Sequence, residues 1–563
     1  MEPMATSPAP LPHHPDVTRF RRRPDEVMRL ARMGSFHRTR LSFMDTLLRR
    51  LASENWRFER PVWEIDERGV GRAVYSVHGP KRSYSLVCFA HDLPDEMRSD
   101  RVIATAWDAT FSLFDGVPDE ADLQRLEANV PKQEAGRISD SELTLSRANR
   151  SVRLFEHVVS RLAAGRQPDP EQVEAVGYLM RTTAVYGSGK FGAADRAKIA
   201  RRPELRGPFQ AEMLCVWLTR AFTLNLVEHL ARARGGDGAA VVEPALRRRF
   251  GVGNSTGLGM APFLMNHPVL LNNWMMAREE ALARVRALPA ADADTVAGFR
   301  AALVGARENA RFWQSEHPIQ QDKLKALRAD LDALAAHMET NDALSGSHPW
   351  DTLWRWAERT LSLEGQEALV SLMMEPHGPL VDDLTDTMHA DEDAAFRIEG
   401  AMSVATLARL MHELYGWGLD VDYEAPENCA RFWYVSEEKL EPRLGERHEE
   451  EGAEYEQPLS IGRDAQRMVA DLERWEGSAR VADFLIAHPE HRHVVRRAQI
   501  AARYPYAEIR DNLISADLLP IDLLRCKLSF FGASRFDPRS DRWVRICMYQ
   551  DAPFPHELLR SAR

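Results

Sequence analysis

The sequence predicts an α+β protein that is predominantly α, with a small antiparallel β module near the N-terminus, a large helical body and a terminal β-hairpin. Segments rich in Val, Tyr, Phe and Trp, separated by turn residues, fill residues 56–115. From residue 119 onward apolar residues recur at a spacing of three to four, which is typical of amphipathic helices. Near the C-terminus, two further strand-like segments flank the turn residues 537–540.

Composition and charge indicate a globular protein and exclude several partner classes. The chain has 563 residues, 44% hydrophobic and 28% charged, and its net charge is 73 − 84 = −11. This acidity disfavours nucleic acid and anionic membranes as partners. No apolar run reaches the roughly 18 residues of a membrane span, and the N-terminus lacks the apolar region of a secretory signal. The chain has five cysteines and no CxxC pair, so we expect its thiols to be reduced and the protein to be cytoplasmic. Whether the chain forms a homo-oligomer is left open.

Turn and cap residues divide the chain into four parts. The Pro-rich start predicts a disordered tail over residues 1–18, followed by an α+β module over 19–118 that ends after an Asp-Gly turn. A helical central domain with glycine-rich loops spans 119–420, and an α+β region spans 421–563. Inside the helical part, Gly165 is expected to end one helix, and Asp169 with Pro170 to begin the next.

The first glycine-rich loop, residues 186–192, is a candidate anion site. Its candidate residues are Tyr186, Gly187, Ser188, Gly189 and Lys190. Glycines that allow close approach, backbone N–H groups before a helix and an ammonium group together suit a carboxylate or phosphate. The loop is not a Walker A motif, because Phe191 stands where Ser or Thr is required, and because we expect a helix before it. The alternative is a flexible connector between two helices.

The second glycine-rich loop spans residues 251–259. Asn254, Ser255, Thr256 and Gly257 with their backbone N–H groups are predicted to form a polar cup for a carboxylate or phosphate. Residues 253–257 also spell G-x-S-x-G, but a nucleophile elbow needs a preceding strand, and residues 245–250 are expected to be helical. A tight turn that packs two helices together remains the alternative.

The second loop leads toward a helix start at Pro268, with Asn266 and His267 where a cap belongs. This Gly- and Ser-rich stretch resembles the signature loop of the aspartase/fumarase lyases, which runs into a Met-Pro and an Asn-Pro. The resemblance covers about fifteen residues, and this chain has no Lys from 251 to 280, where that family keeps one. It therefore does not place the chain in that family.

Three arginines form another candidate anion-binding group. Arg147, Arg150 and Arg153 are spaced at i, i+3 and i+6, so that a helix would place their guanidinium groups on one face. Such a face can hold a dianion, or it can pair with surface carboxylates.

No cofactor is evident from the sequence. Two groups of residues could bind a divalent metal, and this alternative is left open. Asp382, Asp386 and His389 would share one helix face, where the alternative is an ordinary solvated surface. His488, His491 and His493 place three imidazoles within six residues, beside a proline that favours a turn.

The sequence thus favours a cytoplasmic enzyme that acts on a small anionic metabolite by non-redox chemistry, as a lyase, transferase or hydrolase. Lys190 and the loop amides would hold the anion, Tyr186 or His267 would exchange a proton, and Ser255 is the further catalytic candidate. Two alternatives remain open: a non-catalytic helical scaffold or regulatory protein, and a divalent-metal-dependent enzyme. The two loops would have to meet in one pocket for the favoured function to hold.

Overall fold

The structure is a computed structural model of the whole chain. It describes residues 17–94, 96, 106–132, 139–185, 199, 201–255, 267–313, 318–340, 343–388, 396–425, 434–435, 440–441, 461–510, 520–533, 535–537 and 545–561. All structural statements below concern these residues.

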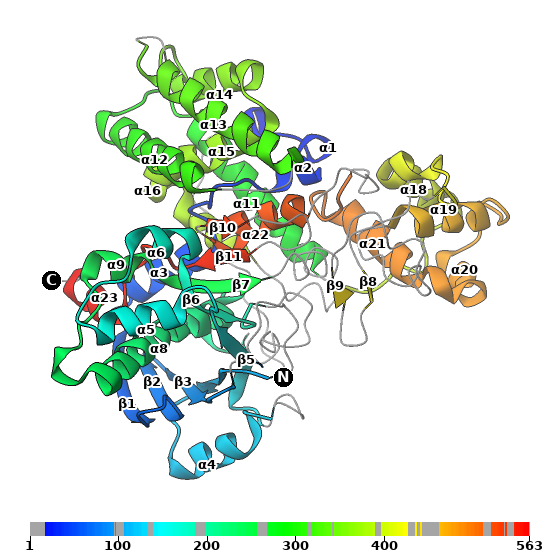
Figure 1. Cartoon of the computed structure of the whole chain (residues 1–563). Coiled ribbons are helices and arrows are strands. Elements are labelled where there is room, and N and C mark those ends of the chain that lie inside the picture. Colours follow the sequence, from blue (N-terminus) through cyan, green and yellow to red (C-terminus); the bar gives the residue numbers. More distant parts are fainter. Residues whose placement is uncertain are drawn as a thin grey trace.

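A nine-stranded mixed sheet forms one half of the molecule, with the order β1-β2-β3-β4-β5-β6-β7-β11-β10 (Figure 1). Neighbouring strands pair antiparallel, except for β6 and β7, which run parallel. The bounds are β1 Arg57–Ile65, β2 Gly71–His78, β3 Ser83–Ala90, β4 Ala109–Asp115, β5 Glu142–Arg150, β6 Tyr178–Thr182, β7 Gly251–Ser255, β10 Arg535–Asp537 and β11 Arg545–Met548. A separate pair, β8 Tyr434–Val435 and β9 Leu440–Glu441, completes the strands.

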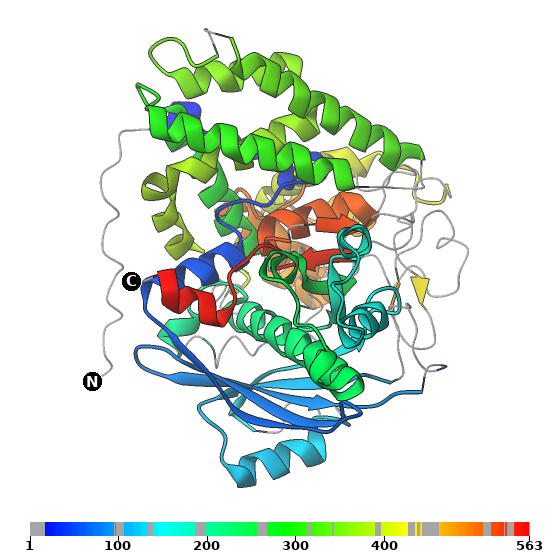
Figure 2. The same cartoon turned by 60° about the vertical axis from the view of Figure 1, so that its left-hand side comes forward.

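Helices cover both faces of this sheet. The long helix α8 (Gln210–Gly235) lies across one face and packs against α5 (Phe155–Ala163). It is apolar on nearly all sides, as a helix buried between layers must be. On the opposite face, Leu123 and Leu126 of α4 (Glu120–Asn129) pack against Val74, Val87 and Leu145 of the strands. Figure 2 shows α8 on one side of the blue strands and α4 on the other.

The other helices form a body beside the sheet and a smaller bundle. Their bounds are α1 Pro24–Val27, α2 Leu30–Met33, α3 Phe43–Ser53, α6 Pro170–Val176, α9 Pro244–Arg249, α11 Pro268–Arg286, α12 Ala293–Phe312, α13 Pro318–Met338, α14 Pro349–Thr360, α15 Leu363–Met374, α16 Gly378–Val381, α18 Val404–Leu419, α19 Ile461–Leu472, α20 Val481–Ala487, α21 Arg492–Arg503, α22 Pro520–Phe531 and α23 Pro555–Ser561. Helices α11 to α16 share one hydrophobic core with the sheet and α8.

Helices α18 to α21 have a hydrophobic core of their own, and Figure 1 shows them standing beside the rest of the chain. In α19 the buried residues Ile461, Ala465, Met468, Val469 and Leu472 recur at helical spacing and face this core. The polar positions between them, including Asp471, are thereby left at the surface of the bundle.

The predicted fold class is wrong, because the β structure is not a small N-terminal module with a separate terminal hairpin. The strands between residues 57 and 115 do pair in sequence order, but the sheet continues through β5, β6 and β7 to the C-terminal strands. Residues 525–531, expected as the first arm of a hairpin, belong to helix α22. Strand β11 pairs with β7 as well as with β10, so the C-terminal strands form one edge of the large sheet. The predicted division into four parts stays a prediction.

Two segments predicted as helical are strands, for reasons that lie in the tertiary contacts. Helix α6 begins at Pro170 with Asp169 as its cap, as predicted, but it ends at Gly177, whose φ of 77° no helix can continue. The next residues, Tyr178–Thr182, are all buried within the sheet. Likewise Arg147 and Arg150 lie on strand β5, so the predicted helical face of three arginines does not exist.

No helix in the described part of the chain is both long enough and apolar enough to cross a membrane.

Candidate functional site

The strand before the first glycine-rich segment and the strand in which the second one begins form the only parallel pair among the described strands. Tyr178 pairs with Gly251 and Arg181 with Gly253, so β6 and β7 end at the same edge of the sheet. Residues 186–192 come shortly after β6, and residues 256–259 come directly after β7. The carboxyl ends of neighbouring parallel strands are where open α/β sheets place their ligands.

Asn254 holds the ends of these two strands together. Its side chain is buried, and its Nδ2 donates to the carbonyl oxygens of Thr182, at 2.8 Å, and Val185, at 3.3 Å. Asn254 was predicted as a ligand-binding residue of the second loop. The structure gives its amide nitrogen two backbone partners beside the end of β6, and its role toward a ligand stays a prediction.

Arg147 and Arg181 share one face of the sheet at this edge. Asn149 pairs with Arg181, and Arg147 lies two residues before Asn149, so all three point the same way. This face is the one opposite α8. Leu145, two residues before Arg147, lies on the same face of β5 and packs against α4. The Arg147 guanidinium stacks on the Trp107 ring, with its Cζ 3.9 Å from the ring centroid, and Arg181 is buried.

Gly253 makes room for the Arg181 side chain. A Cβ atom at Gly253 would lie 2.8 Å from Arg181 Cγ and 2.8 Å from the Tyr178 ring, closer than real side chains approach. This requirement explains one glycine of the predicted loop by packing against a neighbouring strand, and not by loop geometry. The described part of the predicted second loop, Gly251–Ser255, is therefore a strand, whose residues are spaced by sheet geometry.

Arg150 points to the other face of β5. Side chains alternate between the two faces along a strand, so Arg150, three residues after Arg147, points to the opposite face. Its guanidinium lies over the Phe155 ring of α5. Asp108, which is buried, accepts a hydrogen bond from the Arg150 backbone N–H at 2.9 Å, and its Oδ1 lies 3.6 Å from Arg150 Nε. Arg150 is thus a structural ion-pair partner at the sheet–helix interface.

Most of the predicted loop residues lie outside the described residues. These are Tyr186, Gly187, Ser188, Gly189, Lys190, Thr256 and Gly257. Ser255 ends β7, and only its backbone is described. His267 precedes Pro268, the first residue of α11 as predicted, and its half-buried ring meets the Phe209 ring edge-on at 6.3 Å. The roles proposed for these residues stay predictions.

The predicted metal group on residues 382–389 is not supported by the contacts of Asp382. The carboxylate accepts two hydrogen bonds from Arg40, at 2.7 and 2.8 Å, and Arg49 lies 3.6 Å away. A carboxylate held by two guanidinium groups is a poor cation ligand. Asp386 lies on the 3-10 helix Asp382–Thr387, where positions four apart do not align as in an α-helix. His389 lies outside the described residues.

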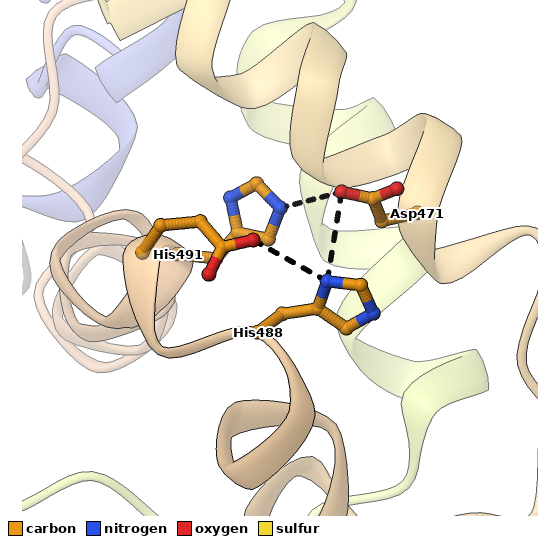
Figure 3. Close-up of side chains that lie close together, drawn as sticks. Asp471, His488 and His491 are labelled. Atoms are coloured by element: carbon orange, nitrogen blue, oxygen red, sulfur yellow. Dashed lines mark hydrogen bonds and ion pairs between the residues drawn. The ribbon is translucent and has the colours of Figure 1, made fainter.

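The histidine-rich turn does bring potential metal ligands together (Figure 3). Asp471 near the end of α19, His488 after α20, and Glu490 and His491 in the 3-10 turn Pro489–His491 each offer one donor atom. These four atoms all lie within 4.8 Å of one another. Sequence analysis identified the two imidazoles but did not select Glu490, which lies between them. It also missed Asp471, which lies 17 positions before His488, since 488 − 471 = 17. No local pattern signals such a partner. His493, predicted with them, instead lies 3.2 Å from Asp464.

Sequence analysis also missed a cleft of about 250 Å³ between the N-terminal segment, α6 and α12. His37, Arg38, Arg249 and Glu375 are among its lining residues. Burial lowers the pKa of His37 to about 4, so its imidazole is neutral at neutral pH. Nothing in the local sequence at residues 34–40 has a recognisable motif, which is why this cleft could not be predicted.

Charges in this cleft are largely matched within its own wall. Arg249 Nε lies 3.3 Å from Glu174 and its Nη1 3.4 Å from Asp551, and all three residues line the cleft. Burial, reinforced by the nearby Asp45, raises the pKa of Glu375. The Arg249 guanidinium in this cleft thus lies close to carboxylates of the cleft wall.

Comparisons with known proteins give no assignment: no protein-family model, no curated protein and no solved structure matches this chain.

Proposed function

We propose that the chain is a cytoplasmic enzyme that binds a small carboxylate- or phosphate-bearing metabolite and transforms it by non-redox chemistry. The metabolite would bind at the sheet face that carries Arg147 and Arg181, which we call the β5–β7 face. The observation that carries this proposal is the juxtaposition of Arg147 and Arg181 on one face, at the edge where the parallel strands β6 and β7 end. Arginine recognises carboxylates and phosphates through paired hydrogen bonds, and a partly buried guanidinium does so more strongly than an exposed one.

The surroundings of the two arginines hold the residues of the proposed site in place. Trp107 holds the Arg147 guanidinium by stacking, which reduces the conformational entropy that binding would cost. Asn254 and Gly253 keep β6 and β7 in register beneath this face. Backbone N–H groups of a glycine-rich segment after a strand suit the same anion, which is the role we propose for the loops that follow β6 and β7.

In this proposal the reacting groups come from the loops and from the start of α11. Lys190 would neutralise the anion, while Tyr186 or His267 would exchange a proton with the substrate and Ser255 would be a further polar or nucleophilic group. The reaction would be an elimination, a group transfer or a hydrolysis, and identification of the ligand would narrow this choice.

The direct test is ligand-induced thermal stabilisation of the full chain, with a panel of dicarboxylates, phosphate monoesters and inorganic phosphate. A ligand that binds the native state alone raises the melting temperature, and the rise grows with the ligand's concentration relative to its Kd. For the best ligand, Arg147→Gln and Arg181→Gln should each weaken binding by about ten- to a hundredfold, since a charge-assisted hydrogen bond contributes about 1.5–3 kcal/mol.

Arg409→Gln is the matched control, because Arg409 is an exposed arginine of α18 that pairs with Glu413. This variant should bind like the wild type. If no member of the panel stabilises the chain, or if the two β5–β7 variants bind as tightly as the control, the proposed function is wrong. Melting curves without ligand distinguish loss of binding from loss of folding.

A further inference from the structure

The turn after α20 carries a donor set that suits a transition-metal cation. Asp471 and Glu490 provide carboxylate oxygens, and His488 and His491 provide imidazole nitrogens. Two imidazoles with carboxylates favour zinc and its neighbours over magnesium or calcium, which prefer oxygen ligands alone. The four residues come from two places in the chain, the end of α19 and the corner between α20 and α21.

The spacing of the donor atoms fits one small cation better than a set of hydrogen bonds. Asp471 Oδ2 lies 2.9 Å from His491 Nε2 and 3.8 Å from His488 Nδ1, and His488 Nδ1 lies 3.4 Å from Glu490 Oε1. Neighbouring ligands of a tetrahedral zinc ion are about 3.3 Å apart, given metal–ligand bonds of roughly 2.0–2.1 Å. Only the shortest of these contacts has good hydrogen-bond length. The three distances lie on either side of this spacing, and the remaining donor pairs, which all lie within 4.8 Å, would close around the ion.

Neighbouring side chains hold both imidazoles in place. The Phe484 ring stacks on His491, with centroids 5.8 Å apart, and on His488, with centroids 5.0 Å apart. The backbone N–H of His488 donates to the Phe484 carbonyl and ends α20, and Pro489 restricts the turn that follows. His491 is buried, whereas Glu490 is exposed. The two imidazoles are thus fixed by packing, Asp471 Oδ1 accepts a hydrogen bond from Arg474 Nη1 at 3.0 Å, and the exposed Glu490 can close over the ion.

We propose that Asp471, His488, Glu490 and His491 form a structural site for a zinc-class divalent cation, which fastens the end of α19 to the α20–α21 corner. Four protein donors complete a tetrahedral shell, which is typical of structural sites, since catalytic sites keep one position for water. The ion would bind to the unprotonated nitrogen of a neutral imidazole, so that His491 Nε2 would exchange its contact with Asp471 for a bond to the metal. This site is independent of the proposed anion-binding face.

The test is titration of the purified, chelator-treated full chain with Zn²⁺, followed calorimetrically, and with Co²⁺, followed by visible absorption. We expect one equivalent of Zn²⁺ to bind, and Co²⁺ to give the intense visible bands of tetrahedral coordination. Zn²⁺ should also slow amide hydrogen exchange in residues 471–491, because it joins two elements of the bundle.

Asp471→Asn and His488→Gln should each lower the Zn²⁺ affinity by about a hundredfold or more, since even groups that only support a ligand contribute about 10- to 100-fold. The matched control is His493→Gln, which removes the histidine of the neighbouring Asp464 pair on the same two helices and should leave the affinity unchanged. His488 and Asp471 are only partly buried, so both variants can fold without the metal.

Three outcomes would overturn the proposal. These are the absence of stoichiometric Zn²⁺ binding, octahedral Co²⁺ spectra, and an affinity that His493→Gln lowers as much as His488→Gln does. The last result would indicate adventitious binding to surface histidines.

Discussion

At the scale of single residues, the strongest electrostatic feature is a buried network that attaches the N-terminal segment to the helical body. Glu367 of α15 accepts hydrogen bonds from Arg22, at 2.7 Å, from Arg32, at 3.0 Å, and from Arg278 of α11. Glu279 binds the other side of Arg22 at 2.7 and 2.8 Å. Buried charges are tolerated because each has a partner of opposite sign.

The network makes the stability of the protein depend on pH. Burial alone would raise the pKa of Glu367, but the charges of Arg22 and Arg278, with the Arg22 hydrogen bond, lower it to about 2. Its ordinary value is 4.5, so the stabilisation is complete above pH 4.5 and is lost as the pH falls from 4.5 toward 2.

Glu367→Gln should lower the free energy of unfolding by about 3–5 kcal/mol at neutral pH, because it leaves buried arginines without their shared carboxylate. Its stability should also fall less steeply between pH 4.5 and 2 than that of the wild type. Denaturant unfolding across this range measures both effects. Glu413→Gln, at an exposed pair with Arg409, should change stability by under about 0.5 kcal/mol. Equal effects of the two substitutions would contradict this account.

At the scale of elements, strand β7 requires glycine because other strands approach it closely. A Cβ at Gly251 would lie 2.3 Å from the backbone oxygen of Met548 on β11. Gly305 in the middle of α12 offers the contrast, since a Cβ there meets nothing within 4 Å. Gly251 is therefore required by close packing, whereas Gly305 is not.

Gly251→Ala should destabilise the protein by about 1–3 kcal/mol, because the added methyl group forces β7 away from β11. Gly305→Ala should instead stabilise it by about 0.5–1 kcal/mol, since alanine loses less backbone entropy in a helix. Thermal unfolding of the two variants beside the wild type checks the opposite signs. A stabilising Gly251→Ala would show that the β7–β11 pairing is absent.

The same elements show where sequence reasoning succeeded and where it failed. Asp169 with Pro170, and Pro268, mark helix starts correctly because capping acts through residues adjacent in the chain. The apolar run at Tyr178–Thr182 was interpreted as helical, because a short buried strand and a buried helix have the same composition. Its neighbours β5 and β7 decide the conformation, and they lie far away in the sequence.

At the scale of the whole molecule, two large hydrophobic cores organise most of the described residues. The larger core unites the sheet, α8 and helices α11 to α16, whereas the smaller one belongs to α18 to α21. Leu369 in α15 and Leu407 in α18 are both fully buried, one in each core. Because contacts between cores are fewer than contacts within them, we expect the two parts to open separately.

Leu407→Ala and Leu369→Ala should each cost about 2–5 kcal/mol, but in different places. Amide hydrogen exchange should lose protection mainly in residues 404–501 for the first variant, and mainly in the sheet and α11 to α16 for the second. Loss of protection throughout the chain in both variants would instead show a single cooperative unit.

Only those residues of the candidate sites that lie close together in the sequence could be recognised from the sequence alone. The histidines at 488 and 491 are neighbours in sequence, and so were recognised together, whereas Asp471 joins them only because α19 packs against α21. Arg147 was selected for a helical spacing that it does not have, and Arg181 was not selected at all. Their shared face exists only through the register of β5 with β6.

The sequence by itself determined the acidic, globular character of the chain, the caps that begin several helices, and the two glycine-rich segments. These depend on composition and on residues a few positions apart. Only the tertiary structure decided that those segments follow adjacent parallel strands, that the C-terminal strands complete a sheet begun at residue 57, and that Asp471 meets the histidine turn. The physical reason is that strand pairing and helix packing join residues hundreds of positions apart, through hydrogen bonds and buried area that no local pattern specifies.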